Sequence, residues 1–261
     1  MGIKFSKYQG TGNDFIMLDN MDNAFNSLSI EQVKLLCDRK LGVGADGLIK
    51  LNSSMELDFD LEYYNSDGTQ SFCGNGSRCS VAFANQLKIC GTNAEFTAID
   101  GVHEATMVNG IISVGMLPVE SIEVANGDYI LDTGSPHYIK LVESQNEIEI
   151  LKFGRKIRYS ERFKDAGINV NLMLVKGPDE IQVSTYERGV ENETLSCGTG
   201  VTACALAYKF LMQGKAGTKI TIHTKGGILS VNSNSFVENK GFENIWLSGP
   251  VKHVFDGIIE I

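Results

Sequence analysis

The sequence has no cluster of lysine and arginine long enough to follow a nucleic-acid backbone, and its 23 basic residues are outnumbered by 32 acidic ones. A net charge of −9 argues against electrostatic binding to phosphates, so we expect no nucleic-acid partner. No stretch approaches the roughly 20 apolar residues of a membrane span, and the first residues hold no apolar run of the signal-peptide kind. We therefore expect a cytoplasmic protein with no membrane partner.

The cysteine spacing typical of structural zinc sites is also missing. The closest cysteine pairs, Cys73 with Cys79 and Cys197 with Cys204, are wider than a C-x2-C motif, so we predict no metal site. A chain of 261 residues with 43% hydrophobic content can bury a sizeable core without disulfides. The six cysteines are therefore expected to be thiols in a reducing compartment.

The sequence does contain a faint internal repeat. Residues 11–16 resemble residues 133–138, and the pair 64–65 resembles the pair 186–187. Residues 73–84, which open with Cys-Gly-Asn-Gly, resemble residues 197–208, which open with Cys-Gly-Thr-Gly. These matches occur in the same order at a nearly constant offset, which indicates two related halves.

Each half has the pattern of several strands and one buried helix. Residues 58–63 alternate in polarity with the period of a strand, while Asn109-Gly110 and Asn126-Gly127 are typical of hairpin turns. The segments that follow the two Cys-Gly-x-Gly motifs are rich in small and apolar residues. They predict buried helices over residues 78–90 and 201–212, closed by Gly91 and Gly214.

These patterns predict an α+β fold of two pseudo-symmetric domains, each a curved, mostly antiparallel sheet wrapped around a central buried helix. The N-terminal domain is expected to span residues 1–118 and to be completed by a returning strand at 250–261. The C-terminal domain is expected to span 119–249. Small-molecule sites commonly lie between domains, so we expect the active site in the cleft between these two.

If the two halves are related by a pseudo-twofold axis, Cys73 and Cys197 lie on opposite sides of one pocket. Inversion of a carbon centre by proton transfer needs a base on one face and an acid on the other, and a thiolate and a thiol can supply both. Backbone N–H groups at a helix start attract an anion such as a carboxylate. The groups in question belong to Gly74, Asn75, Gly198 and Thr199.

The other four cysteines are expected to be inert, because an isolated cysteine is usually a small buried hydrophobic residue. They are Cys37, Cys79, Cys90 and Cys204. Cys73 and Cys197 differ from them because each precedes a Gly-x-Gly turn and both occupy the matching place in the repeat.

Several motifs taken together resemble the diaminopimelate epimerase family. They are YQGTGNDF at 8–15, NSDGT at 65–69, CGNGSRC at 73–79, GSPH at 134–137, YERG at 186–189 and ETLSCGTG at 193–200. The resemblance runs from the first expected strand to residues 253–257. It implies that LL- and meso-diaminopimelate are interconverted without a cofactor, with Cys73 and Cys197 as the acid and base, in the biosynthesis of lysine and of a peptidoglycan precursor. It also implies a homodimer.

The same resemblance implies roles for further residues. Substrate binding would fall to Asn13, Asn65, Gly74, Asn75, Ser135, Asn169, Glu187, Arg188, Gly198 and Thr199. His137 and Glu187 would tune the pKa values of the two cysteines. An arginine suits a carboxylate because it can donate two parallel hydrogen bonds, and the side chains of Asn and Glu can accept from an ammonium group.

The chain departs from the family pattern at four places. Gly47 stands where some members have a glutamine that touches substrate, and Ser135 replaces the asparagine common before Pro-His. The segment between Arg188 and Cys197 is one residue longer than in many members. Phe255 stands where a tyrosine at the dimer contact is frequent.

Three alternative functions are open. A racemase or epimerase of proline, hydroxyproline or histidine would use paired cysteines as well, although it would not need residues for a distal amino-acid end. A cysteine hydrolase or transferase would use Cys73 or Cys197 as nucleophile and His137 as its base. A noncatalytic binding protein could retain the same fold, but it would not need both cysteines.

Overall fold

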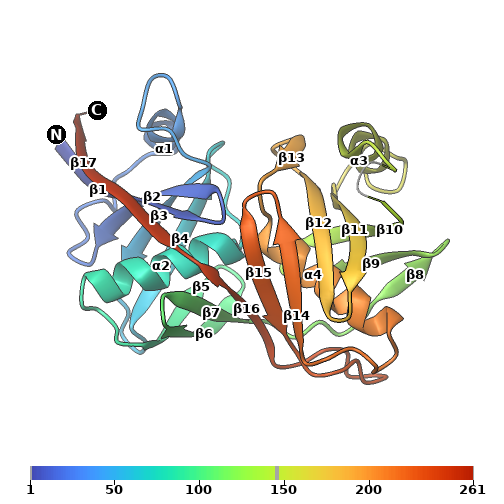
Figure 1. Cartoon of the computed structure of the whole chain (residues 1–261). Coiled ribbons are helices and arrows are strands. Elements are labelled where there is room, and N and C mark those ends of the chain that lie inside the picture. The colour runs from blue at the N-terminus through green and yellow to red at the C-terminus, as the bar shows by residue number, and fades with distance from the viewer. Residues whose placement is uncertain (1, 145–146, 261) are drawn as a thin grey trace. The chain divides into compact units, whose positions relative to one another are not determined.

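The computed structural model describes residues 2–144 and 147–260. Met1 and Ile261, which belong to the predicted N-terminal domain and returning strand, lie outside the described residues. The chain divides into two compact units (Figure 1). The first runs to Val114 and includes the segment from Gly249 onward, and the second spans Gly115–Ser248. Both contain helices and a mixed sheet, so the chain has an α+β fold.

The first unit is built on a sheet with both parallel and antiparallel pairings. Its strands are β1 (Gly2–Gly10), β2 (Asn13–Asn20), β3 (Gly47–Asn52), β4 (Phe59–Asn65), β5 (Asn93–Ala98), β6 (Gly101–Val108), β7 (Ile111–Met116) and β17 (Lys252–Glu260). The pairs β2–β3 and β4–β5 are parallel. The pairs β1–β2, β3–β4, β5–β6 and β6–β7 are antiparallel. The late strand β17 pairs with β1 along its whole length, with Gly2 opposite Glu260, and is drawn in red beside blue β1 in Figure 1.

The second unit is built in the same way. Its strands are β8 (Glu123–Ala125), β9 (Asp128–Asp132), β10 (Pro136–Val142), β11 (Asn169–Gly177), β12 (Glu180–Glu187), β13 (Asn192–Thr194), β14 (Lys219–Thr224), β15 (Gly227–Asn232) and β16 (Ile245–Pro250). The pairs β10–β11 and β12–β14 are parallel. The pairs β9–β10, β11–β12, β14–β15 and β15–β16 are antiparallel. Parallel and antiparallel pairings therefore follow one another in the same order in both units, as expected for a duplicated architecture.

Each unit also has a short helix that connects two parallel strands, β2 and β3 in the first unit and β10 and β11 in the second. These helices are α1 (Ile30–Cys37) in the first unit and α3 (Ile150–Arg158) in the second. Ser29 caps α1 in a capping box with Gln32, in which each side chain bonds the other's backbone N–H. Apolar side chains of α1, Val33 and Leu36 among them, join a core cluster with strands of the first unit.

The two helices that follow the cysteine motifs are buried, as the sequence predicts. Helix α2 (Gly74–Gln86) packs against β1, β2, β3, β4 and β6, and helix α4 (Gly198–Leu211) packs against β9, β10, β11, β12, β14 and β15. In α4 every residue from Gly198 to Lys209 is buried. Such helices bury side chains on all faces, which explains why their sequences lack a polar stripe.

The predicted end of the first helix is wrong. Helix α2 ends at Gln86 rather than at Cys90, and Gly91 does not terminate it. Lys88 adopts a left-handed conformation, with φ of 63°, and the N–H of Ile89 bonds the carbonyl of Ala84. These are features of a Schellman motif, with lysine in the place usually taken by glycine. The apolar residues after Gln86 extend the helical pattern in the sequence beyond the true end.

Both predicted hairpin turns are confirmed. Asn109 and Gly110 connect β6 to β7, and Asn126 and Gly127 connect β8 to β9. All four have positive φ, as a type I′ turn requires.

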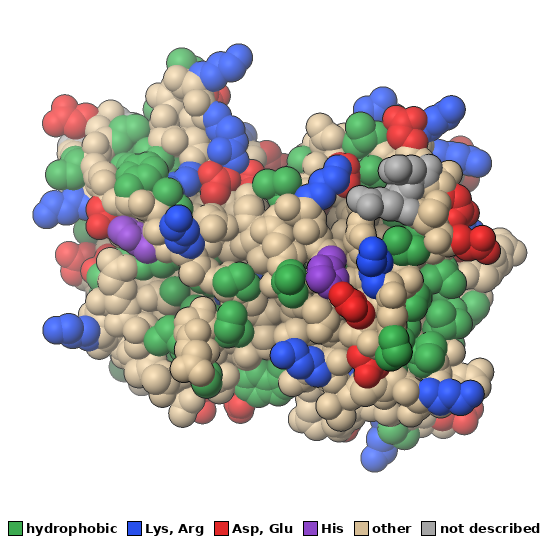
Figure 2. Space-filling view, viewed as in Figure 1, with side chains coloured by type: hydrophobic (Ala, Val, Ile, Leu, Met, Phe, Trp, Pro, Cys, Tyr) green, Lys and Arg blue, Asp and Glu red, His purple; other side chains and the backbone are tan. Residues whose placement is uncertain are grey.

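On the face shown in Figure 2, the lysine and arginine side chains of the described residues are scattered among acidic and neutral ones. None of the helices in the ranges 2–144 and 147–260 has the length and apolar content needed to cross a membrane.

Candidate active site

The motif residues 73–76, called here the first cysteine turn, form the start of α2. Cys73 is the N-cap residue of the helix, and its Sγ accepts a hydrogen bond from the N–H of Gly76 at 3.4 Å. Gly74 and Asn75 are the first two helical residues and are buried. Helix geometry leaves the N–H groups of these first positions without intrahelical acceptors. The turn therefore combines a thiol with donors suited to an anion.

Asn13, predicted as a substrate-binding residue, lies against the first cysteine turn. Its Oδ1 is 3.8 Å from the Sγ of Cys73 and accepts from the Nδ2 of Asn75 at 3.3 Å. Its own Nδ2 donates to Asp46 Oδ2 at 2.7 Å. An ionised carboxylate only accepts hydrogen bonds, so Asp46 fixes the orientation of the Asn13 amide and directs its oxygen toward Cys73. Asp46, which lies in the loop before β3, was not predicted as a site residue.

A charge network continues behind Asp46. Arg39 donates to Asp14 through both terminal nitrogens, at 3.1 and 2.6 Å, and to Asp46 at 2.8 Å. Lys7 lies 2.8 Å from Asp14. Burial would raise the pKa of Asp14, but the hydrogen bonds from Arg39 and Lys7 outweigh it and lower that pKa to about 2. Asp14 is therefore charged at neutral pH and anchors the loop that carries Asp46.

Asn65 was predicted to bind substrate, but in the structure its side-chain amide is hydrogen-bonded to neighbouring residues of the protein. Its Oδ1 accepts from the hydroxyl of Tyr63 at 2.8 Å. Its Nδ2 donates to Thr69 Oγ1 at 3.0 Å and to Ser71 Oγ at 3.2 Å. The amide thus closes the turn that leads from β4 toward Cys73.

Tyr63 also accounts for the departure at Gly47. A Cβ atom at Gly47 would lie 2.4 Å from the Tyr63 ring, which is too close for any side chain. The tyrosine ring fills the space beside residue 47, and its hydroxyl holds Asn65. Tyr63 was not predicted as a site residue, because a tyrosine in a strand of alternating polarity usually belongs to the core.

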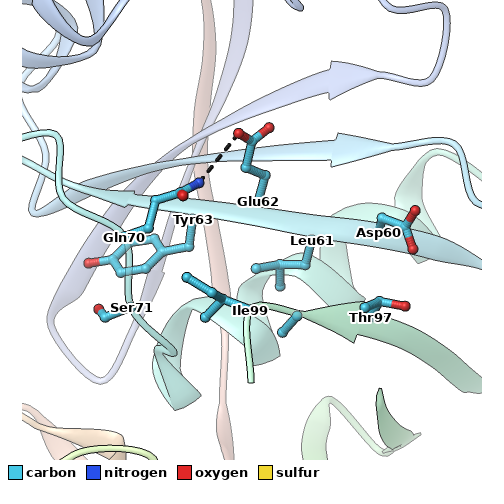
Figure 3. A pocket seen from close by; sticks show the side chains of 9 residues that line it. Asp60, Leu61, Glu62, Tyr63, Gln70, Ser71, Thr97 and Ile99 are labelled. Carbon is cyan, nitrogen blue, oxygen red and sulfur yellow. Dashed lines mark hydrogen bonds between the residues drawn. The ribbon is translucent and has the colours of Figure 1, made fainter. Parts of the chain in front are cut away.

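A shallow pocket of about 210 Å³ also lies in the first unit (Figure 3). Side chains of β4, of the segment between β4 and α2, and of the end of β5 with Ile99 line it, and Gln70 donates to Glu62. It includes Tyr63 but none of the predicted site residues.

The motif residues 197–200, called here the second cysteine turn, form the start of α4. Cys197 is the N-cap residue and is buried. The hydroxyl of Thr199 lies 3.5 Å from its Sγ and 2.9 Å from the Nε2 of His137. His137 is fully buried. The structure therefore brings together His137, Thr199 and Cys197, all three predicted from the sequence.

The second ring nitrogen of His137 identifies its tautomer. Asn171 Nδ2 lies 3.1 Å from His137 Nδ1, while Asn171 Oδ1 accepts from the hydroxyl of Thr185 at 2.8 Å. Because the amide nitrogen of Asn171 donates, Nδ1 must accept, and the ring proton belongs on Nε2. Burial first, and the positive charge of Arg188 second, lower the pKa of His137 to about 3. The ring is neutral at physiological pH and donates to Thr199.

Gly200 is required by this network. A Cβ atom at this position would lie 2.7 Å from Asn171 Oδ1 and 3.2 Å from both His137 Cε1 and Thr185 Oγ1. The last glycine of the second cysteine turn therefore gives three polar groups room to approach the helix. Asn171 and Thr185 were not predicted as site residues.

Ser135, Asn169 and Arg188 form a second group in the same unit. Asn169 Nδ2 donates to Ser135 Oγ at 2.8 Å, and Asn169 Oδ1 accepts from the backbone N–H of Arg188 at 2.9 Å. The guanidinium of Arg188 donates to the Ala166 carbonyl at 2.9 Å. No ion pair of the described residues includes Arg188. Glu187, which precedes it at the end of β12, is partly exposed.

The four cysteines predicted to be inert have environments that favour the thiol. Burial raises the pKa of Cys37 to about 12 and that of Cys90 to about 11. Burial also raises the pKa values of Cys79 and Cys204 well above the ordinary range. None of these side chains is therefore a thiolate at neutral pH.

Within the described ranges, no three His, Cys, Asp or Glu side chains are grouped so that they could hold a metal ion.

The sequence matches the family model described as diaminopimelate epimerase over residues 5–110 and 129–254. It is 47% identical over 260 residues to a diaminopimelate epimerase of Flavobacterium psychrophilum, with 98% of this chain and 100% of the relative covered. It is 37% identical over 277 residues to a diaminopimelate epimerase of Aquifex aeolicus, with 98% of this chain and 97% of the relative covered.

Solved structures with a similar fold are more distant in sequence. A Bacillus anthracis phenazine biosynthesis protein of the PhzF family matches with a TM-score of 0.78 at 12% identity, with 100% of both chains covered. A hydroxyproline epimerase from Agrobacterium vitis matches with a TM-score of 0.73 at 13% identity, with 99% of this chain and 92% of that one covered. At these identities the likeness concerns the fold alone.

Proposed function

Since this chain belongs to the diaminopimelate epimerase family, we propose that it is an isomerase that interconverts LL- and meso-diaminopimelate, with Cys73 and Cys197 as a cofactor-independent acid/base pair. One observation carries the proposal. Two cysteines are the N-cap residues of two buried helices, at corresponding places in two units with the same strand pairings.

The reaction requires both sulfurs to reach the same alpha carbon from opposite faces, so residues of both units would hold the substrate. One cysteine, as a thiolate, removes the alpha proton and becomes a thiol. The electron pair of the broken C–H bond delocalises into the adjacent carboxylate. The other cysteine, as a thiol, gives its proton to the opposite face of the carbon and becomes a thiolate, so the reaction conserves protons and charge.

Helix N–H groups stabilise the negative charge that develops on the carboxylate, as in an oxyanion hole. The groups in our proposal belong to Gly74, Asn75, Gly198 and Thr199. They lie at the starts of α2 and α4, beside the two cysteines. Donors that are already oriented before the reaction need no reorganisation when the charge forms.

The unreacted end of the substrate carries its own carboxylate and ammonium groups. We propose that Arg188 binds this carboxylate, because it is a cation with no ion-pair partner among the described residues. Asn169 holds the backbone of Arg188, and Ser135 holds Asn169. Asn13, Asn65 and Glu187 complete the proposed substrate contacts, and Glu187 joins His137 in tuning the cysteines.

The proposal extends to architecture and location. In it, each sheet curves around its buried helix, the two domains are pseudo-symmetric, and the enzyme is cytoplasmic, in lysine and peptidoglycan-precursor biosynthesis. We also propose a homodimer, supported by exposed apolar side chains on β17, namely Val254, Phe255 and Ile258. Light scattering of wild type and Phe255→Lys tests the dimer. A wild-type protein that is monomeric at micromolar concentration contradicts it.

Proton exchange in D2O tests the reaction directly. Reduced protein is incubated with LL-diaminopimelate without added cofactor, and the product is analysed by NMR. We expect deuterium at one alpha carbon together with meso product. Both signals should vanish in Cys73→Ala and in Cys197→Ala, and both should persist in the control Cys90→Ala, whose thiol follows the end of α2 and has a pKa raised by burial.

Each other outcome favours a different function. Absence of exchange by wild type contradicts the substrate, and exchange with proline, hydroxyproline or histidine instead would identify a racemase or epimerase of that amino acid. Retained turnover in one of the two cysteine variants contradicts the two-base mechanism and favours a single nucleophile.

A further inference from the structure

Arg78 lies in α2, close behind the first cysteine turn, and it is among the largest fully buried side chains of the described residues, with 0% of its surface exposed. Its Nη1 donates to the carbonyl of Gly74 at 3.3 Å. Its Nη2 donates to Asn75 Oδ1 at 2.9 Å and reaches Thr11 Oγ1 at 3.5 Å. Its Nε has no hydrogen-bond partner. All three acceptors are neutral.

A buried guanidinium normally pairs with a carboxylate, because removing an isolated charge from water is costly. No ion pair of the described residues includes Arg78. Burial lowers the pKa of Arg78 to about 10, while Cys79 and Cys73 act in the opposite direction. The side chain therefore remains a cation at neutral pH, and the groups that interact with its charge are two cysteines.

On the strands that pack against α2, the other buried side chains that can carry a positive charge each have an acidic partner. The pairs are Lys7 with Asp14 on β1 and β2, Lys50 with Glu62 on β3 and β4, and His103 on β6 with Asp100. Lys4, Asp19 and Glu104 on these strands are exposed, and Asp60 is half-buried. The phenol of Tyr8 on β1 is hydrogen-bonded to Gln86, and its pKa is raised to about 12, chiefly by burial. These groups leave the positive charge of Arg78 uncompensated.

Of the two cysteines, only Cys73 can supply a negative charge. Cys79 is fully buried, and burial raises its pKa far above neutrality. Cys73 is partly exposed and accepts the N–H of Gly76 as the N-cap residue of α2. A nearby cation and a helix N-terminus both favour the thiolate form of a cysteine.

The second unit lacks this cation at the corresponding place. The repeat aligns Arg78 with Thr202, which is buried and donates to the Gly198 carbonyl at 2.9 Å, as Arg78 does to Gly74. The buried group beside the second cysteine turn is instead the neutral ring of His137, and Arg188, the cation whose charge acts on that ring, is only half-buried. The two turns share a backbone design and differ in local charge.

We propose that Arg78 is a positioning residue for the proposed epimerisation: its buried positive charge stabilises the Cys73 thiolate, so that Cys73 is the more acidic of the two cysteines. Its hydrogen bond to Asn75 also holds that residue against Asn13, which faces the Cys73 sulfur. This inference rests on the proposed function, because it assigns unequal resting states to the proposed acid/base pair.

The pH dependence of alkylation tests the inference without substrate. Reduced protein is treated with iodoacetamide from pH 5 to pH 10, and the rate at each cysteine is measured by peptide mass spectrometry. In wild type the midpoint for Cys73 should lie below that for Cys197. In Arg78→Met the Cys73 midpoint should rise by about 1 pH unit or more. Arg78→Lys, which keeps the charge, should retain most of the wild-type value.

Thr202→Val is the matched control and should leave the Cys73 midpoint unchanged. Circular dichroism identifies any variant that fails to fold, in which case the comparison of Cys73 with Cys197 in wild type still decides. A wild-type Cys73 midpoint at or above that of Cys197, or a folded Arg78→Met protein with an unchanged midpoint, would overturn the inference. Alkylation needs no turnover. A protein that is inactive on diaminopimelate would therefore refute the proposed function, while the alkylation midpoints would still test the role of Arg78.

Discussion

The Nε2 atom of His137 lies 2.9 Å from the hydroxyl of Thr199, and that hydroxyl lies 3.5 Å from the sulfur of Cys197. The side-chain amide of Asn171 donates to the other ring nitrogen, so the histidine donates to the Thr199 hydroxyl through Nε2. The hydroxyl hydrogen of Thr199 is then directed toward the sulfur of Cys197. A neutral histidine thus acts on Cys197 through an intervening hydroxyl. In this arrangement it orients a donor and is not itself a base.

Replacement of Thr199 should reveal this donor. Thr199→Val keeps the shape of the side chain but removes the hydroxyl, and hydrogen bonds to charged groups contribute enough for a loss of about tenfold to a hundredfold in kcat. Thr199→Ser keeps the hydroxyl and should retain most activity. Steady-state kinetics with both variants check this expectation, and equal activity of the Val and Ser variants would contradict it.

His137 should make the protein sensitive to mild acid. The pKa of the buried ring is about 3 against 6.5 for the ordinary histidine, so the unfolded chain takes up a proton that the folded chain does not. The free energy of unfolding is therefore unaffected by the titration of this residue above pH 6.5, and it decreases as the pH falls from 6.5 toward 3. Between pH 7 and pH 5 the loss should be about 2 kcal/mol.

Urea unfolding at several pH values measures this loss. His137→Gln should be less stable at pH 7 but should have a flatter pH dependence than wild type over this interval. His253→Gln, which changes an exposed histidine on β17, is the control and should keep the wild-type slope. A His137→Gln variant as pH-sensitive as wild type would show that the buried ring is not the source.

Gly200→Ala should disrupt the second cysteine turn. The added methyl group would lie 2.7 Å from Asn171 Oδ1, so Asn171, His137 or α4 must shift. We expect a loss of about 1 to 3 kcal/mol in stability together with a large fall in kcat. Gly91→Ala is the control, because a Cβ at that position meets nothing within 4 Å. Thermal unfolding compares the two, and equal melting temperatures would contradict the close approach.

Tyr63 should act on substrate binding through Asn65. Tyr63→Phe removes the hydroxyl that donates to Asn65 Oδ1 while keeping the ring beside Gly47. If Asn65 binds substrate, the freed amide should raise KM by about fivefold to tenfold, with little change in kcat. Tyr159→Phe, a change at an exposed tyrosine, is the control. An unchanged KM would indicate that Asn65 serves only the turn.

The sequence was most informative where a residue that shapes the backbone is also one proposed to carry the chemistry. Cys73 and Cys197 could be predicted as helix starts because a helix N-terminus and a Gly-x-Gly turn are local features. The end of α2 could not be predicted, since the Schellman motif at Lys88 uses a lysine where glycine is usual. A local sequence pattern predicts a backbone conformation only where the residue type that usually adopts that conformation is present.

Supporting residues on other elements were harder to predict. Asn171 contacts His137 because β11 pairs in parallel with β10. The register of this pairing cannot be predicted from the sequence of either strand alone. One signal was present, however. Asn169 and Asn171 stand two residues apart at the start of a strand that continues with the apolar residues 172–175, so a sheet places both on the same face. Asp46 had no comparable signal, because it lies in a loop and its hydrogen-bond partner Asn13 is 33 residues away in the sequence.

The pairing of β17 with β1 has a consequence for the order of events during protein synthesis. A ribosome makes β1 first and β17 only after the whole second unit has been made, so β1 must wait for its partner. The second unit is continuous in sequence and can form while the first still has an open sheet edge. Chains released before residue 252 would therefore keep that edge exposed, and they would be the ones that chaperones must hold.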